Sequence, residues 1–211
     1  MRLSPSKFEA LVWFLFKDSD VDEEITGYLF RLPRFLQRGR AALHGNVQAH
    51  QLMSELYTIH HKLLRITSEL QGSLRDAPNS ISSPAAPYGF CLALRCIFNC
   101  MLRGLKCDDI QLLAEGEELV EATLALAHDA ARFRPLGAGH MMLNFCTAWT
   151  CTDSSSKRLL IEDALYEYGQ DFIRNRNVRM PTPLLEILSS DLHFETPISG
   201  AVSLEIMPRA A

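Results

Sequence analysis

The sequence has no long hydrophobic run and no excess of positive charge. Its most apolar run, residues 11–16, is far shorter than the roughly 20 residues that a membrane-spanning helix needs. Glu9 precedes this run and Lys17 follows it, which is the reverse of a secretory signal. With 21 Lys and Arg against 25 Asp and Glu, the formal charge of −4 provides no general field for nucleic acid or anionic lipid. We expect no membrane partner, no secretion and no direct DNA binding.

The sequence also lacks closely paired cysteines. Its six cysteines include no Cys-x-x-Cys pair, the spacing that lets a tight turn aim two thiolates at one zinc ion. Instead, Cys96, Cys100 and Cys107 follow helical spacing along one stripe. Buried, reduced cysteine behaves as a small hydrophobic residue, so we expect these side chains to pack in the core rather than to serve a metal or redox site.

Catalytic and cofactor-binding motifs are missing as well. There is no His-Glu-x-x-His, no Glu-x-x-His, no Gly-x-Ser-x-Gly and no Gly-x-x-x-x-Gly-Lys in the sequence. His60 and His61 are neighbours that would point about 100° apart on a helix, so we expect one to pack and the other to be solvated. We therefore predict no metal ligands, no cofactor, no catalytic residues and no enzymatic activity.

Apolar periodicity predicts an all-α fold, an irregular bundle of about seven to nine helices. No internal repeat and no alternating run long enough for a sheet is present. The pattern divides the chain into an N-terminal helical half (1–75), a linker loop (76–87), a C-terminal helical half (88–191) and a tail (192–211). At 211 residues and 47% hydrophobic content, the two halves suit one continuous domain.

In the N-terminal half, the pattern predicts a helix from Ser6 to about Ser19 and a second beginning near Asp20. Pro33 is expected to kink or divide the second helix. A long amphipathic helix is predicted from Val47 to about Leu74.

In the C-terminal half, Tyr88–Leu105 is apolar nearly all round, so we expect a central helix enclosed by its neighbours. Asp108 and Asp109 are expected to cap the next helix, with its acidic residues outward. Leu112, Leu113, Val120, Leu124 and Ala127 are expected to face inward, and Glu115, Glu118, Glu121 and Asp129 outward. Further helices are predicted over 140–150, over 156–174 and from a cap at Thr182, and a short strand over 202–207.

Two surfaces are candidates for binding. The first is the apolar stripe of the long helix, formed by Leu52, Leu56, Ile59, Leu63, Ile66 and Leu70. This stripe could take a partner helix, although packing within the domain would use the same pattern. The second is a basic ridge formed by Arg31, Arg34 and Arg38, and a further cluster contains Arg174, Arg176 and Arg179. These arginines could contact phosphate or could be the solvated face of a helix.

Several motifs resemble one family. They are Trp13, Pro33–Leu36, Phe133–Gly137, Lys157-Arg158 and Met180–Leu184. In this pattern the sequence resembles the C-terminal regulatory region of fungal binuclear zinc cluster transcription factors. The resemblance implies an all-helical domain, residence in the nucleus, and control of metabolic or secondary-metabolite genes through protein contacts or small effectors.

The zinc cluster of that family has no counterpart here. It is built from N-terminal Cys-x-x-Cys pairs, whereas the first cysteine of this chain is Cys91. We therefore expect a regulatory domain without a DNA-binding module, with other transcription regulators or a full-length relative as partners. Whether the chain is a fragment of a longer zinc cluster protein stays open.

Two alternatives stay open. One is an α-helical enzyme or small-molecule carrier of a biosynthetic pathway, with His140 as the polar contact. Its pocket would be lined by Tyr88, Phe90, Phe98, Met141, Met142 and Trp149. The other is a scaffold that forms an oligomer.

Overall fold

The structure, a computed structural model, describes residues 23–43, 49–76, 85–106, 109–134, 140–171 and 182–193. These ranges contain seven α-helices, one 3₁₀ turn and no strand, so the prediction of an all-α bundle is confirmed. The elements are α2 (Glu23–Leu43), α3 (Ala49–Asp76), α4 (Ala85–Leu105), α5 (Ile110–Ala130), η1 (Ala131–Phe133), α6 (Met141–Cys151), α7 (Ser155–Gly169) and α8 (Thr182–Leu192).

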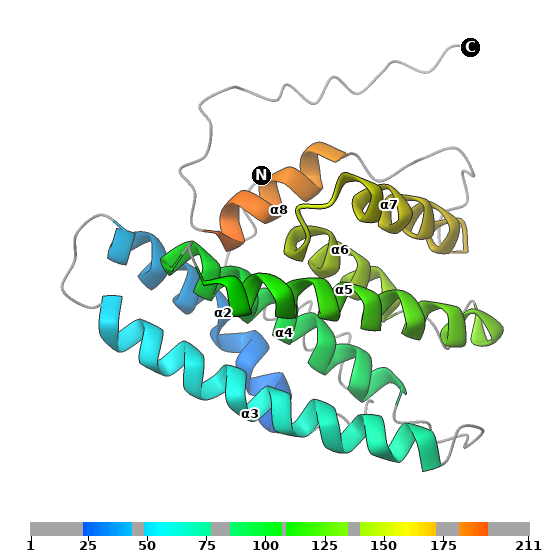
Figure 1. The fold of residues 1–211 in the computed structure, drawn as a ribbon, viewed down its shortest axis with the longest axis horizontal. Helices are drawn as coiled ribbons and strands as arrows, with labels where there is room; N and C mark the ends of the chain where they lie inside the picture. The colour runs from blue at the N-terminus through cyan, green and yellow to red at the C-terminus, as the bar shows by residue number, and fades with distance from the viewer. Residues whose placement is uncertain are drawn as a thin grey trace.

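Helix α4 lies at the centre of the bundle, as its apolar composition predicts. It contacts α2, α3, α5, α6 and α8. Figure 1 shows α5 crossing in front of it, with α3 on one side and α6 on the other. Within the described ranges, α4 is the one helix long and apolar enough to cross a membrane, and 78% of its most apolar window is buried in the bundle. One hydrophobic cluster contains buried side chains of every α-helix from α2 to α8.

The apolar stripe of α3 is part of this core. Its members Leu52, Leu56, Ile59 and Leu63 are buried, and Ile66 and Leu70 pack against the cluster while partly buried. The prediction that this stripe is a surface for a partner helix is therefore wrong. The reason is that α4 presents an apolar face to α3, and burying the stripe there removes its large side chains from water.

Helix α2 runs through Pro33 without a break, so of the two expected outcomes, a kink or a division, the division is wrong. A proline inside a helix costs about 3 kcal/mol because it removes one backbone hydrogen bond. Leu32 and Phe35 flank it and are 7% and 1% exposed. Their burial contributes roughly 1.5–3 kcal/mol each, which is enough to offset the cost.

Local capping signals place several helix ends. The Asp109 side chain accepts hydrogen bonds from the backbone N–H groups of Gln111 and Leu112, which confirms it as the cap of α5. The hydroxyl of Ser154 caps α7 in the same way. Several predicted boundaries differ. Helix α3 ends at Asp76 and α4 begins at Ala85, so both extend into the predicted linker 76–87. Helix α7 ends at Gly169, before the predicted Arg174, and Thr182 is the first residue of α8 rather than its cap.

Some predictions lie outside the described residues. They are the helix over 6–19, the strand over 202–207, the cluster of Arg174, Arg176 and Arg179, and the positions of Asp108 and Cys107. Trp13, most of the linker 76–87 and parts of the motifs at 133–137 and 180–184 lie outside them as well.

The burial of the α3 stripe predicts a large difference between two adjacent leucines. Leu63 is 0% exposed and Leu64 is 40% exposed. We expect Leu63→Ala to lower the free energy of unfolding by about 2–5 kcal/mol, because it leaves a cavity against α4. The control Leu64→Ala should cost less than about 1 kcal/mol. Urea unfolding followed by circular dichroism measures both, and equal effects would contradict the placement of Leu63 in the core.

Candidate functional site

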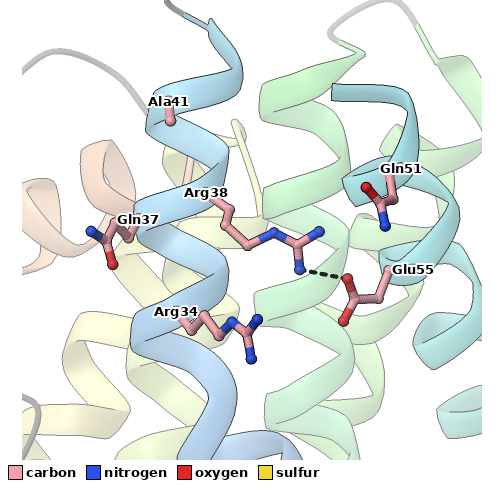
Figure 2. Close-up of a pocket in the computed structure, with 6 residues that line it drawn as sticks. All are labelled: Arg34, Gln37, Arg38, Ala41, Gln51 and Glu55. Atoms are coloured by element: carbon pink, nitrogen blue, oxygen red, sulfur yellow. Dashed lines mark hydrogen bonds and ion pairs between the residues drawn. The ribbon is translucent and has the colours of Figure 1, made fainter. Parts of the chain in front are cut away.

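A groove of about 590 Å³ lies between α2 and the first half of α3. Residues of both helices line it: Arg34, Gln37, Arg38 and Ala41 from α2, and Gln51 and Glu55 from α3. In Figure 2, Arg34 and Arg38 point from α2 toward α3, where Gln51 and Glu55 lie. Most of the lining side chains are polar, so this surface is suited to a hydrated polar or charged ligand rather than an apolar one.

The two arginines of the groove differ in their surroundings. The guanidinium of Arg38 donates a hydrogen bond to a carboxylate oxygen of Glu55 at 2.5 Å, which ties α2 to α3. Arg34 is exposed and makes no ion pair with any residue that the structure describes. No residue in the described ranges compensates its charge, whereas Glu55 compensates that of Arg38.

The predicted basic ridge is only partly gathered at this groove. Arg34 and Arg38 line it, but Arg31 is exposed and is not among the lining residues. From Gly27 to Leu43, α2 carries four arginines and no acidic residue. This local positive charge stands out on a chain whose formal net charge is −4.

A second cavity, of about 340 Å³, lies where α3, α4, α5 and η1 approach one another. Its lining is mainly apolar and includes Leu74, Tyr88, Leu126 and Phe133, with charged residues such as Arg75. Burial raises the pKa of the Tyr88 hydroxyl, although Arg95 and Arg75 oppose this shift. The hydroxyl is therefore protonated at neutral pH.

The pocket predicted for a carrier or an enzyme does not assemble as a set. Tyr88 lines the second cavity, and Met142 is partly buried against the core. The remaining members are buried side chains of the core: Phe90, Phe98, Met141 and Trp149. Phe98 and Met141 are 0% exposed, so they serve packing.

His140 lies directly before α6, against α4. A Cβ atom at Gly89 would lie 2.7 Å from both the His140 ring and the Asn144 amide nitrogen, so only glycine allows this close approach. The Nε2 atom of His140 and the Oδ1 atom of Asn144 are buried and have no hydrogen-bond partner among the described residues. Burial lowers the pKa of His140 to about 4, so the ring is neutral at physiological pH.

A buried polar network joins α3, α4 and α5. One carboxylate oxygen of Glu115 lies 2.9 Å from His60 Nε2, and the other accepts a hydrogen bond from Arg95 at 2.5 Å. The Asn99 amide donates to the Leu112 carbonyl oxygen at 2.8 Å and to Glu115 at 3.3 Å. The prediction that Glu115 faces outward is therefore wrong, because its partners His60 and Arg95 both lie inside the bundle.

This network changes the ionisation of Glu115. Burial alone would raise the pKa of this carboxyl group, but the hydrogen bonds and charges of His60 and Arg95 lower it to about 2. His60 is buried and His61 is exposed, so the expectation that one packs and the other is solvated is confirmed. The apolar periodicity of α3 indicates that His60 faces the core, but no sequence feature predicts that Glu115 is its partner.

Within the described ranges, no group of three or more His, Cys, Asp or Glu side chains is arranged to hold a metal ion. Glu115 pairs with His60 and Arg95 at the interface of α3, α4 and α5, whereas His60 Nδ1 and Arg95 Nε are buried without a hydrogen-bond partner among the described residues. The groove between α2 and α3 presents Arg34, whose charge no described residue compensates, and it is the candidate site for binding.

Comparisons of the chain with protein-family models, with curated proteins and with solved structures find no match.

The ion pairs of Glu115 predict a loss of stability in acid. Because the pKa of Glu115 is about 2 in the folded chain and 4.5 when unperturbed, its contribution is present above pH 4.5 and disappears as the pH falls toward 2. We expect a loss on the order of 2–3 kcal/mol over this window. In Glu115→Gln, the free energy of unfolding should fall less steeply between pH 4.5 and pH 2, which is the acid limb of its pH dependence. The stability of this variant at pH 7 should be lower than that of the parent chain.

Urea unfolding from pH 7 to pH 2 measures these effects. The matched control is Glu118→Gln on the exposed face of α5, which should keep the limb of the parent chain. An unchanged acid limb in Glu115→Gln would contradict the network.

The buried neutral ring of His140 predicts a second, earlier acid limb. Its pKa is about 4 when folded and 6.5 when unperturbed, so protons favour the unfolded chain. Stability should be full above pH 6.5 and should fall by on the order of 2–3 kcal/mol as the pH falls to 4. We expect His140→Gln to reduce this loss, and the exposed control His61→Gln to retain it. The same unfolding series measures both variants.

Proposed function

We propose that this chain is a non-enzymatic, all-helical regulatory domain that acts by binding other proteins, of the kind that its sequence resembles. Its biological setting would be the control of transcription in the nucleus, with metabolic or secondary-metabolite genes as targets. The observation that carries the binding role is the groove between α2 and α3, where Arg34 presents a charge that no described residue compensates.

The charge of the groove indicates the chemistry of its partner. Four arginines and no carboxylate lie between Gly27 and Leu43, and Glu55 compensates Arg38 from across the groove. A partner that brings carboxylates to Arg34 would gain charge complementarity, and the exposed Arg31 would add attraction at longer range. The occupant that fits is an acidic segment of a partner regulator. DNA fits less well, because the whole chain is acidic.

The groove itself can be tested with a defined acidic probe. The probe is a fluorescent decapeptide of alternating Glu and Ala, measured by fluorescence anisotropy at low salt. We expect Arg34→Glu to weaken binding about tenfold, since it replaces one attraction by a repulsion. Binding should also weaken as salt is added, because the charges are exposed.

The matched control is Arg65→Glu, the same charge change on an exposed part of α3 that lies outside the groove. It should leave the affinity within about twofold of the parent chain. Equal weakening in both variants would show that net charge alone attracts the peptide, and it would contradict a specific site.

The regulatory role needs a separate measurement. The parent chain and Arg34→Glu are used side by side to capture proteins from nuclear extract, and the captured proteins are identified by mass spectrometry. We expect transcription regulators with the parent chain and their depletion with the variant. Recovery of no transcription regulator, together with a solely cytosolic location of the protein in cells, would contradict the proposal.

A further inference from the structure

Three helix ends bring thiols and an imidazole together in the core, away from the groove. Cys100 belongs to α4, Cys151 ends α6, and His193 follows α8. The Sγ atoms of Cys100 and Cys151 lie 3.5 Å apart. The Cys151 thiol also donates to the Cys96 carbonyl oxygen at 3.3 Å. His193 lies near enough to the Cys100 thiol for its ring to lower the pKa of Cys100.

The contacts of His193 fix its ring. Its Nδ1 atom lies 2.9 Å from the Ser189 carbonyl oxygen, one turn earlier in the helix. Around Cys100, the carbonyl oxygen and the hydroxyl oxygen of Thr150 lie 3.4 Å and 3.5 Å from Sγ. Residues of α6 and of the end of α8 therefore hold the Cys100 and Cys151 side chains in one arrangement.

We propose that Cys100 and Cys151 are a modification site, in which a hydroperoxide oxidises them to an intramolecular disulfide that links α4 to α6. The separation of 3.5 Å between the two sulfurs leaves about 1.5 Å to close before they reach the bond length of about 2.05 Å, a distance that side-chain rotation within contacting helices covers. The contact with His193 makes Cys100 the thiol that reacts first.

The ionisation of the two thiols supports this order. Burial alone would raise the pKa of Cys100, but hydrogen bonds with Cys151 and His193 and the charge of His193 lower it well below its usual value. Hydrogen bonds with Cys100 and Cys96, together with burial, raise the pKa of Cys151 well above its usual value. Of the two thiols, Cys100 is therefore the one that loses its proton more readily, and Cys151 is the one that resolves the product.

The reaction has two steps, and both balance. The Cys100 thiolate attacks one oxygen of the hydroperoxide, the O–O bond breaks, and the leaving alkoxide or hydroxide takes a proton from the His193 imidazolium. Cys100 is then a sulfenic acid. The sulfur of Cys151 attacks the Cys100 sulfur, the S–O bond breaks, and the hydroxide leaves as water with the proton of Cys151. Overall, two thiols are oxidised and one hydroperoxide is reduced to an alcohol or water.

Access to the pair is controlled by the end of α8. Cys100 and Cys151 are 0% and 1% exposed, whereas His193 is partly exposed beside them. A Cβ atom at Gly104 of α4 would lie 2.5 Å from the His193 carbonyl oxygen, so α8 approaches α4 this closely only because residue 104 is glycine. Because the atoms in the way belong to the His193 backbone, we expect Gly104→Ala to displace the end of α8 and so to expose the Cys100–Cys151 pair.

The direct test uses the full chain without substitution. It is treated with a small excess of hydrogen peroxide at pH 7 and analysed by intact mass spectrometry and by peptide mapping without reduction. We expect a mass decrease of two hydrogens and a link between the peptides that contain Cys100 and Cys151. A disulfide between other cysteines would overturn the proposal. It would also be overturned if all six thiols of the chain stay reduced under conditions that fully oxidise the amino acid cysteine in solution.

Substitutions then separate the two thiols. In Cys151→Ser, a cyclic dione should trap a sulfenic acid at Cys100, because the resolving thiol is absent. Cys100→Ser should form no disulfide between residues 100 and 151. The matched control is Cys146→Ser. Cys146 is more exposed than either thiol of the pair, but burial raises its pKa to about 11. In this variant the Cys100–Cys151 disulfide should form as in the parent chain. Trapping at Cys146 instead of Cys100 would contradict the proposal.

Two further variants test the base and the access path by the rate of thiol loss. We expect His193→Gln to slow oxidation about tenfold, because it lowers the thiolate fraction of Cys100. Gly104→Ala should accelerate oxidation at least about threefold. Circular dichroism verifies that both variants are folded. An unchanged rate in His193→Gln would contradict the activation of Cys100, and slower oxidation in folded Gly104→Ala would contradict the access path.

Discussion

Helix α4 is in contact with five other helices, and the rest of the structure depends on how its polar groups are accommodated there. An apolar helix in this position would be stabilised by burial alone, which has no direction. Helix α4 also carries Arg95, Asn99 and Arg103 into the core region. Each must find a partner, because a buried charge or amide without one is costly.

The partners come from different helices and thereby fix their positions along α4. Arg95 and Asn99 engage Glu115 on α5, and Glu115 also binds His60 on α3. Arg103 donates to the Cys151 carbonyl oxygen at the end of α6 at 2.7 Å. Sliding any of these helices by one turn would leave charges buried without partners, whereas apolar contacts would re-form nearly as well. The hydrophobic core thus supplies the stability, and the polar groups select one arrangement of the helices.

The features that sequence predicts well are those that depend on a short stretch of chain. The four-and-three spacing of leucines in α3 and the capping side chain of Asp109 are local, and both are found in the structure. The site residues were harder. Arg95 lies 20 positions from Glu115, and Cys100 lies 51 positions from Cys151. Contacts at such separations depend on how the helices pack, and no spacing rule contains them.

Glu115 shows why a charge pattern misleads. Its spacing from Glu118 and Glu121 is that of a solvated helix face, so charge alone places it outward. The side chains on the neighbouring helices, which the charge pattern of α5 does not include, decide which carboxylate faces inward. Arg95 and His60 both lie where Glu115 points.

The α3 stripe and the groove beside it present the reverse case. An amphipathic stripe has the same sequence pattern whether it packs on its own chain or on another protein, and here α4 occupies it. Once the apolar face of α3 is filled, the part of α3 that faces α2 at the groove is polar, with Gln51 and Glu55. Glu55 compensates only one of the two arginines that α2 presents there. The binding proposed for this groove would therefore be electrostatic, and it would depend on salt and favour acidic partners.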